Sequence, residues 1–199
     1  MLELLTGAGL AMAAGLNAYI PLLALGLAGR FLDVVALPDA WAWLENDWVL
    51  ITLAGLLVIE FVADKVPAVD KINDWLQTIV RPTAGGIAFT TGTGAETRTV
   101  TDPAELFSSN WVPIVTGILL ALGVHLLKMA ARPVLNVATA GVAAPIASVT
   151  EDIASVGLSV FAMVLPILLV VLIPALVIGA WLAIRSVRRR RRERLPAIP

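Results

Sequence analysis

The sequence predicts an all-α integral membrane protein with four transmembrane helices and two short broken or re-entrant segments. Hydrophobic residues make up 59% of the 199 residues and charged residues only 15%, whereas soluble domains carry roughly 25% charged residues. A soluble core of this size cannot bury so much apolar surface. Apolar runs that approach or exceed the length of a spanning helix recur along the chain. We therefore expect a lipid bilayer around most of the chain.

The four predicted spans are long stretches that carry few or no charges. They cover residues 4–29, 48–63, 111–131 and 153–184. The first is interrupted at residues 17–21, where Pro21 lacks a backbone donor and favours a kink or a break. The last is longer than one straight span, so we expect tilt or a kink. Trp48 and Trp111 open the second and third spans, which is typical of the aromatic belts at membrane surfaces.

Residues 65–80 have apolar positions at helical spacing and predict an amphipathic helix in the interface plane.

Two further segments begin with Arg-Pro and contain glycine or a second proline. Residues 81–94 follow that helix and residues 132–148 follow the third span, and we expect neither segment to cross the bilayer. Opposed broken segments are typical of inverted-repeat transporters. The pair is therefore a candidate inverted repeat, with chance similarity in an alanine- and leucine-rich sequence as the alternative.

The distribution of charge predicts the orientation in the membrane. Seven of the 14 basic residues are arginines within residues 185–194, and the positive-inside rule places such a cluster in the cytoplasm. With four spans the N-terminus is cytoplasmic too, and the acidic loop 30–47 lies outside. Residues 1–184 then form one membrane domain, and residues 185–199 form a basic cytoplasmic tail that contacts anionic lipid. No aromatic residue or folded motif that could recognise bases accompanies the tail, so nucleic acid is not an expected partner.

Composition excludes several kinds of chemistry. The chain has no cysteine, and His125 is its single histidine, which excludes disulfides, thiolate metal sites and multi-histidine sites within one chain. No Gly-x-Ser-x-Gly, phosphate-loop or His-Glu-x-x-His motif is present. We therefore expect no cofactor, no metal and no enzymatic activity. A lipid-processing enzyme, in which paired carboxylates hold a divalent ion, is the weaker alternative.

Polar residues within or beside the spans are the candidate functional residues, because a charge in a span costs about 2.5–3.5 kcal/mol on insertion scales. Glu60 is the deepest acid, and the predicted topology places it and His125 in opposite halves of the membrane. The easiest local pairs are Glu60 with Arg81, and Lys128 or Arg132 with Glu151 or Asp152. The candidate pathway or substrate-binding residues are Asn17, Tyr19, Glu60, Asp64, Lys65, Arg81, His125, Lys128, Arg132, Asn136, Glu151 and Asp152.

Several of these candidates also have a plainer interpretation. Some of the charges, if they lie at the membrane surface, need no function, because lysine and arginine stems can snorkel to water. This alternative applies to Asp64, Lys65, Lys128 and Arg132. Asn17 and Tyr19 could line a site or bond to a neighbouring helix. His125 by itself is more typical of a packing residue than of a proton carrier.

These observations favour a small transporter or channel that carries an ion or small solute through a polar pathway near Glu60. The alternative is a non-catalytic membrane scaffold or accessory subunit. Four spans are few for a transport pathway, so a homo-oligomer is expected, with a dimer favoured.

Three motifs resemble a known family. They are Gly-Leu-Asn-Ala-Tyr-Ile-Pro at residues 15–21, Glu-Phe-Val-Ala-Asp-Lys-Val-Pro-Ala-Val-Asp at residues 60–70, and Lys-Met-Ala-Ala-Arg-Pro-Val-Leu-Asn at residues 128–136. The sequence resembles a family of small bacterial integral membrane proteins that is known only as a domain of unknown function. Ala144 stands where the family pattern has asparagine. The resemblance implies a multi-pass protein of the bacterial inner membrane, and it implies no activity.

Overall fold

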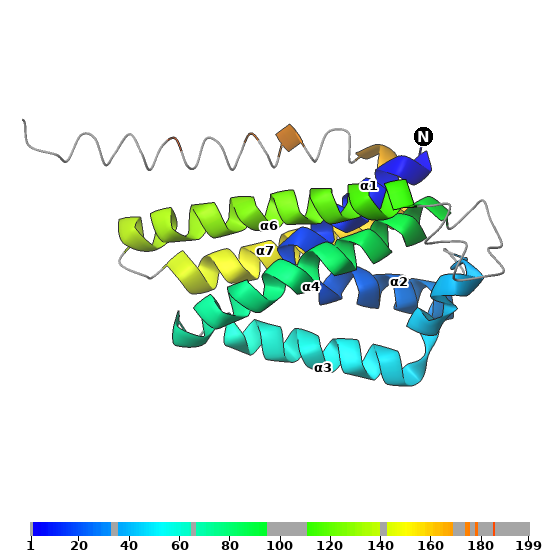
Figure 1. Cartoon of the computed structure of the whole chain (residues 1–199), viewed down its shortest axis with the longest axis horizontal. Coiled ribbons are helices and arrows are strands. Elements are labelled where there is room, and N and C mark those ends of the chain that lie inside the picture. Colours follow the sequence, from blue (N-terminus) through cyan, green and yellow to red (C-terminus); the bar gives the residue numbers. More distant parts are fainter. Residues whose placement is uncertain are drawn as a thin grey trace, which may run out of the picture.

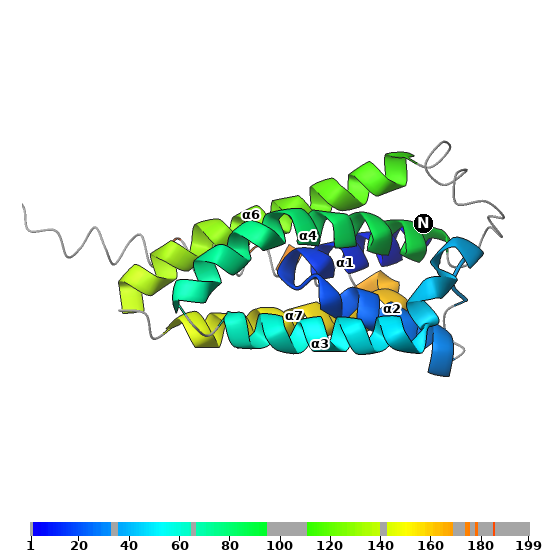
Figure 2. The same cartoon turned by 60° about the horizontal axis from the view of Figure 1, so that its bottom comes forward.

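The structure is a computed structural model that describes residues 2–32, 36–64, 67–94, 111–139 and 143–168, with isolated residues further on. Within these residues every regular element is helical, which confirms the predicted all-α class. The long helices run along a bundle and surround two shorter ones, α1 (Leu2–Leu16) and α2 (Tyr19–Phe31), as Figures 1 and 2 show. The long helices are α3 (Asp47–Ala63), α4 (Pro67–Gly94), α6 (Trp111–Thr139) and α7 (Ala143–Val164). The closely packed interior includes Leu10, Leu25, Leu44 and Leu158, each no more than 2% exposed.

The apolar stretch at the N-terminus forms two helices that meet inside the bundle. α1 spans Leu2–Leu16 and α2 spans Tyr19–Phe31, which confirms the break predicted at residues 17–21. Figure 2 shows that the start of α1 and the end of α2 lie at the same end of the bundle. Contacts agree, because Gly7 lies against Thr93 near the end of α4, and Pro38 lies against Gly94. The prediction of one crossing helix over residues 4–29 is therefore wrong.

Helix α4 corrects the prediction of a separate segment at residues 81–94. It runs unbroken over Pro67–Gly94 and contains Pro82. The glycines of this stretch serve packing rather than a break, because small residues let helix backbones approach closely. A Cβ atom added at Gly85 would lie 2.8 Å from the carbonyl oxygen of Gly117 on α6. The Arg-Pro sequence therefore lies within a continuous helix.

Residues 132–148 also form no separate segment. Their first part ends α6, which spans Trp111–Thr139, and their last part begins α7, which spans Ala143–Val164. Gly141, one of the predicted breakers, lies outside the described residues. Pro145 occupies the first turn of α7, where a missing backbone donor is tolerated. With both Arg-Pro segments absorbed into long helices, the inverted repeat is not confirmed.

The described helices indicate a membrane protein with fewer clear spans than predicted. Trp111–Pro133 and Pro145–Val164 are long and apolar enough to cross a membrane. A third candidate is the pair of η1 (Asp39–Glu45) and α3 (Asp47–Ala63), which bends by 64°. The described residues thus hold two or three candidate spans, against four predicted. A short turn, η2 (Pro166–Leu168), follows α7.

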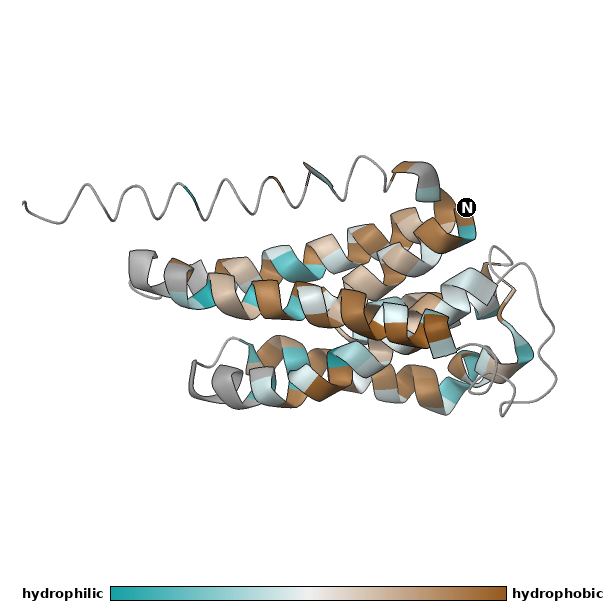
Figure 3. Ribbon diagram, turned by 45° about the horizontal axis from the view of Figure 1, so that its top comes forward, coloured by the Kyte–Doolittle hydropathy of each residue, from teal (hydrophilic) through white to brown (hydrophobic). Residues whose placement is uncertain are grey.

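Helix α4 is long but more polar than the candidate spans. Its second half packs between α1 and α6 (Figure 2), so it need not present an apolar surface on all sides. Figure 3 shows apolar residues over much of the helix surface, with hydrophilic residues among them toward the end away from the N-terminus. Outward-facing side chains such as Ile59, Leu119 and Ile153 are more than 60% exposed, as expected of helices that contact lipid.

Candidate functional site

The break between α1 and α2 frees backbone groups that lipid cannot satisfy, and side chains satisfy them instead. Asn17, 1% exposed, accepts hydrogen bonds at Oδ1 from the backbone N–H groups of Tyr19 at 3.0 Å and Ile20 at 3.2 Å. It therefore caps the start of α2. Its amide nitrogen donates to Oδ1 of Asp152 on α7 at 3.0 Å. Because Oδ1 accepts these two backbone hydrogen bonds and Nδ2 donates to Asp152, the Asn17 side-chain amide fits its surroundings in one orientation only.

The carbonyl groups at the end of α1 are held by three neighbouring helices. Arg81 on α4 donates to the carbonyl of Gly15 at 3.4 Å, and Lys128 on α6 donates to the carbonyl of Leu16 at 3.3 Å. Ser155 on α7 donates to the carbonyl of Ala13 at 2.9 Å. Cations stabilise a helix C-terminus, where the carbonyl groups carry partial negative charge. The break is thus fixed by long-range contacts.

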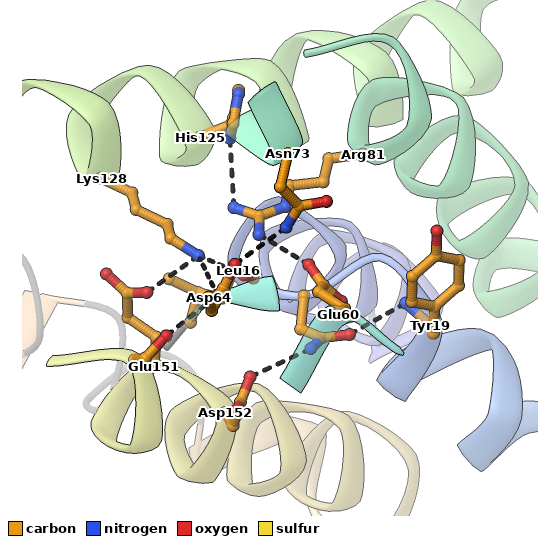
Figure 4. Close-up of polar contacts among 12 residues, drawn as sticks. Leu16, Tyr19, Glu60, Asp64, Asn73, Arg81, His125, Lys128, Glu151 and Asp152 are labelled. Atoms are coloured by element: carbon orange, nitrogen blue, oxygen red, sulfur yellow. Dashed lines mark hydrogen bonds and ion pairs between the residues drawn. The ribbon is translucent and has the colours of Figure 1, made fainter. Parts of the chain in front are cut away.

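A buried ion pair lies beside the break (Figure 4). Nη2 of Arg81 donates to Oε1 of Glu60 on α3 at 2.7 Å, and the two side chains are 0% and 1% exposed. Nη1 of Arg81 lies 3.1 Å from Nδ1 of His125. Because a guanidinium only donates, Nδ1 of His125 accepts and the ring proton lies on Nε2, 3.0 Å from the Thr78 hydroxyl. His125 is therefore a neutral imidazole.

A second set of ion pairs lies one to two helical turns away. Lys128 lies 2.8 Å from Glu151 and 3.7 Å from Asp64. Arg132 lies 3.0 Å from Glu151 and 3.2 Å from Asp64. Ser148 donates to Oδ2 of Asp64 at 2.9 Å. These contacts join α3, α6 and α7.

The charges around Asp64, which follows the last residue of α3, decide its ionisation. Burial raises the pKa of its carboxyl group, but the ammonium of Lys128 and the guanidinium of Arg132 outweigh burial and hold the pKa below its usual value. Asn73 on α4 donates to its other oxygen, Oδ1, at 2.8 Å. Asp64 is therefore an ionised, fully bonded carboxylate.

Several buried polar atoms at the break have no hydrogen-bond partner among the described residues. They are Oε2 of Glu60, Oε1 of Gln77 and Nε of Arg81. Gln77 is 2% exposed and interacts with the hydroxyl of Tyr19. Buried polar atoms without protein partners mark positions for ordered water or a small polar solute. These atoms lie on α3 and α4 beside the break, next to the hydroxyl of Tyr19 on α2.

The structure brings together ten of the twelve residues predicted from the sequence. Lys65 lies outside the described residues, and Asn136 lies on α6 with a side chain that is not described. The predicted Glu60–Arg81 pair is present. The expectation of polar clusters in opposite halves of the membrane is wrong. The continuous α4 returns the chain to the end of the bundle where α3 began, so α3 and α6 run in the same direction. The polar residues near the ends of α3 and α6 therefore lie at the same end of the bundle.

Burial also decides between the two interpretations of the basic residues. Lys128 is 6% exposed and Arg132 is 8% exposed, and both pair with buried acids. The surface interpretation is wrong for these two and for Asp64, which is 7% exposed. Sequence reasoning missed Gln77, although its position four residues before Arg81 places it on the same face of α4.

The carboxylates do not gather as metal ligands. In the part of the chain that the structure describes, no three His, Cys, Asp or Glu residues are placed to hold a metal ion. Asp64 and Glu151 contact Lys128 and Arg132 instead. The arrangement suits charge neutralisation inside the bundle.

Comparison with known proteins gives a family and no described activity. None of the curated proteins and none of the solved structures matches the chain significantly. A family model described as "Domain of unknown function (DUF4126)" matches residues 4–189. That match covers nearly the whole chain, including the three motifs that carry the resemblance, and the chain therefore belongs to this family.

Proposed function

We propose that the protein is a small membrane transporter or channel that carries an ion or small solute along a polar pathway past Glu60. One observation carries the proposal: the α1–α2 break lies inside the bundle among buried charges, and Oε2 of Glu60 and Oε1 of Gln77 beside it have no hydrogen-bond partner in the part of the chain that the structure describes. Transporters place substrate and coupling-ion sites at discontinuous helices near the middle of the membrane. Ionisable residues kept there are functional by default, because their burial is costly.

The competing function is a non-catalytic scaffold or accessory subunit. A scaffold requires only that its buried groups satisfy one another. The network around Asp64 meets that requirement. The groups at the break do not, because Glu60 and Gln77 each keep an oxygen without a partner among the described residues. A metal-dependent lipid enzyme fits less well, because bases rather than open positions surround Asp64 and Glu151.

The proposal includes an orientation in the bacterial inner membrane. The positive-inside rule favours a cytoplasmic position for the arginine-rich residues 185–199. The start of α1 lies at the same end of the bundle as η1, next to the acidic loop 30–47 (Figure 2). That arrangement favours an N-terminus outside the cytoplasm, in place of the cytoplasmic N-terminus predicted from four spans. A homo-oligomer, with a dimer favoured, remains part of the proposal.

Reconstitution into liposomes tests the function. Purified protein in vesicles is offered a panel of protons, sodium, potassium, chloride and small neutral or charged solutes. We expect flux of at least one of these, strongly reduced in Tyr19→Phe and in Glu60→Gln. Tyr19→Phe removes only the hydroxyl beside Gln77 and leaves every ion pair intact. Asp39→Asn, an exposed acid on η1, is the matched control and should behave as the wild type.

Folding must be measured alongside flux, because Glu60 belongs to a buried ion pair. Size-exclusion profile and melting temperature in detergent identify variants that fail to fold. A wild-type protein that carries nothing in the panel contradicts the proposal. Wild-type flux that persists in a folded Tyr19→Phe and a folded Glu60→Gln contradicts the pathway past Glu60. A scaffold would give no flux in any of the proteins.

A further inference from the structure

The network of charged side chains around the break holds one more acid than bases among the described residues, and two of its acids, Glu151 and Asp152, are only partly buried. Its acids are Glu60, Asp64, Glu151 and Asp152, and its bases are Arg81, Lys128 and Arg132. His125 adds no charge, because it accepts a hydrogen bond from Arg81. Three acids lie within ion-pair distance of a base. Asp152 is the acid that does not, and its hydrogen-bond partner is the neutral amide of Asn17.

The surroundings of Asp152 offer little else to stabilise a charge. It lines an open groove of about 330 Å³ whose other lining residues are all apolar. These are Ile20, Leu57, Val58, Phe61 and Val156. The charged groups that act on it are Lys128 on α6, which favours its negative charge, and Asp64 on α3 and Glu151 on α7, which oppose it. A carboxylate with apolar walls and no direct base is costly, and a proton removes that cost.

We infer that Asp152 is the proton-binding residue of this site, and that the transported or coupled ion is a proton. The inference rests on the proposed function and specifies its ion. Oδ1 of Asp152 is occupied by Asn17, so the proton binds at Oδ2. A hydronium ion transfers its proton to Oδ2 and leaves as water, and release reverses the step. No oxidant, reductant or further reactant takes part.

The proton on Asp152 is linked to the break through Asn17. The same amide donates to Asp152 and caps the start of α2 through its oxygen. A hydrogen bond to an ionised carboxylate is roughly twice as strong as one to a neutral acid. Proton release therefore tightens the hold of Asp152 on Asn17 and on the start of α2. Glu60, whose Oε2 has no partner among the described residues, points toward the same break from α3 (Figure 4).

Proton flux into pyranine-loaded proteoliposomes tests the inference, with the membrane potential clamped by potassium and valinomycin. A pH gradient should acidify vesicles that contain the wild type or Asp39→Asn. Asp152→Asn should lower the rate by about tenfold or more, because loss of a proton-transferring group has effects of at least that size. Asp152→Glu keeps a carboxyl group and should retain part of the rate. Asparagine keeps an oxygen that accepts from Asn17, so the fold should survive.

Infrared spectroscopy gives a readout that needs no transport. The carbonyl stretch of a protonated carboxylic acid should titrate in the wild type and in Asp39→Asn, and the part of this band that comes from Asp152 should be absent from Asp152→Asn. An unchanged band in Asp152→Asn overturns the inference. Wild-type flux of another ion or solute that ignores the pH gradient overturns the inference alone. Absence of all flux from the wild type overturns the proposed function itself.

Discussion

The buried pair of Glu60 and Arg81 can be measured by a double-mutant cycle. Both side chains are at most 1% exposed, and 2.7 Å separates Oε1 from Nη2. Removing one member of a buried pair leaves an uncompensated charge and costs about 3–5 kcal/mol. Glu60→Gln should fall in this range. Arg81→Gln should cost more, because Arg81 also donates to Gly15 and His125.

The double variant should lose less than the sum of the single variants. With neither charge present, no unpaired ion remains at the break, so we expect a coupling energy of about 2–3 kcal/mol, near the upper end for residues in contact. At about 2–4 °C per kcal/mol for a chain of this length, each single variant should melt roughly 6–20 °C below the wild type. Thermal unfolding in detergent micelles, followed by size-exclusion chromatography, provides the measurement.

An exposed pair with the same separation is the matched control. Nη1 of Arg30 lies 2.7 Å from Asp47, but these side chains are 34% and 67% exposed. Solvent screens such pairs, so their coupling should be about 0–1 kcal/mol. Additivity within about 0.5 kcal/mol at Glu60 and Arg81 would refute the reasoning, because the pair would then behave like the exposed one.

Two other predictions concern packing and topology. Gly85→Ala should destabilise the protein by about 1–3 kcal/mol through overpacking, because the added Cβ would meet the backbone of Gly117. The control is Gly123→Ala, whose added Cβ has nothing within 4 Å and which should be neutral or stabilising in thermal unfolding. Equal melting temperatures of the two variants would contradict the packing of α4 on α6. A single cysteine at Leu2 should react with a membrane-impermeant thiol reagent added outside intact cells, and so should a single cysteine at Asp39. If the Leu2→Cys thiol reacts only after the membrane is opened, the N-terminus does not lie outside.

The helical class and the polar residues could be predicted from composition and from the placement of charges in apolar stretches. Glu60, Asp64 and Arg81 stand out because a bilayer penalises them unless they are paired. The break at Asn17 follows from a proline in an apolar helix. Each of these signals is local in the sequence, and each residue lies in the site.

The path of the chain could not be predicted, because it depends on which helices cover one another. The sequence around Gly85 predicts a broken segment, yet the glycines fit against α6 and the helix continues. Hydropathy alone likewise cannot tell one crossing helix over residues 4–29 from two half-length helices that return to the same end. The contacts of Gly15 and Leu16 with bases on α4 and α6 decide this, and those bases lie 66 and 112 residues further along.

Access of water to the α1–α2 break tests the central claim most directly. The chain has no cysteine, so each single cysteine variant carries one reactive thiol. Tyr19→Cys places that thiol at the break. The two controls are Ile153→Cys, on a surface expected to contact lipid, and Leu32→Cys, at the end of α2. In oriented vesicles a transport pathway predicts that Tyr19→Cys reacts with a small charged thiol reagent from at least one side, and faster than Ile153→Cys. A Tyr19→Cys thiol that resists the reagent from both sides, while Leu32→Cys reacts fully, would contradict a polar pathway past Glu60.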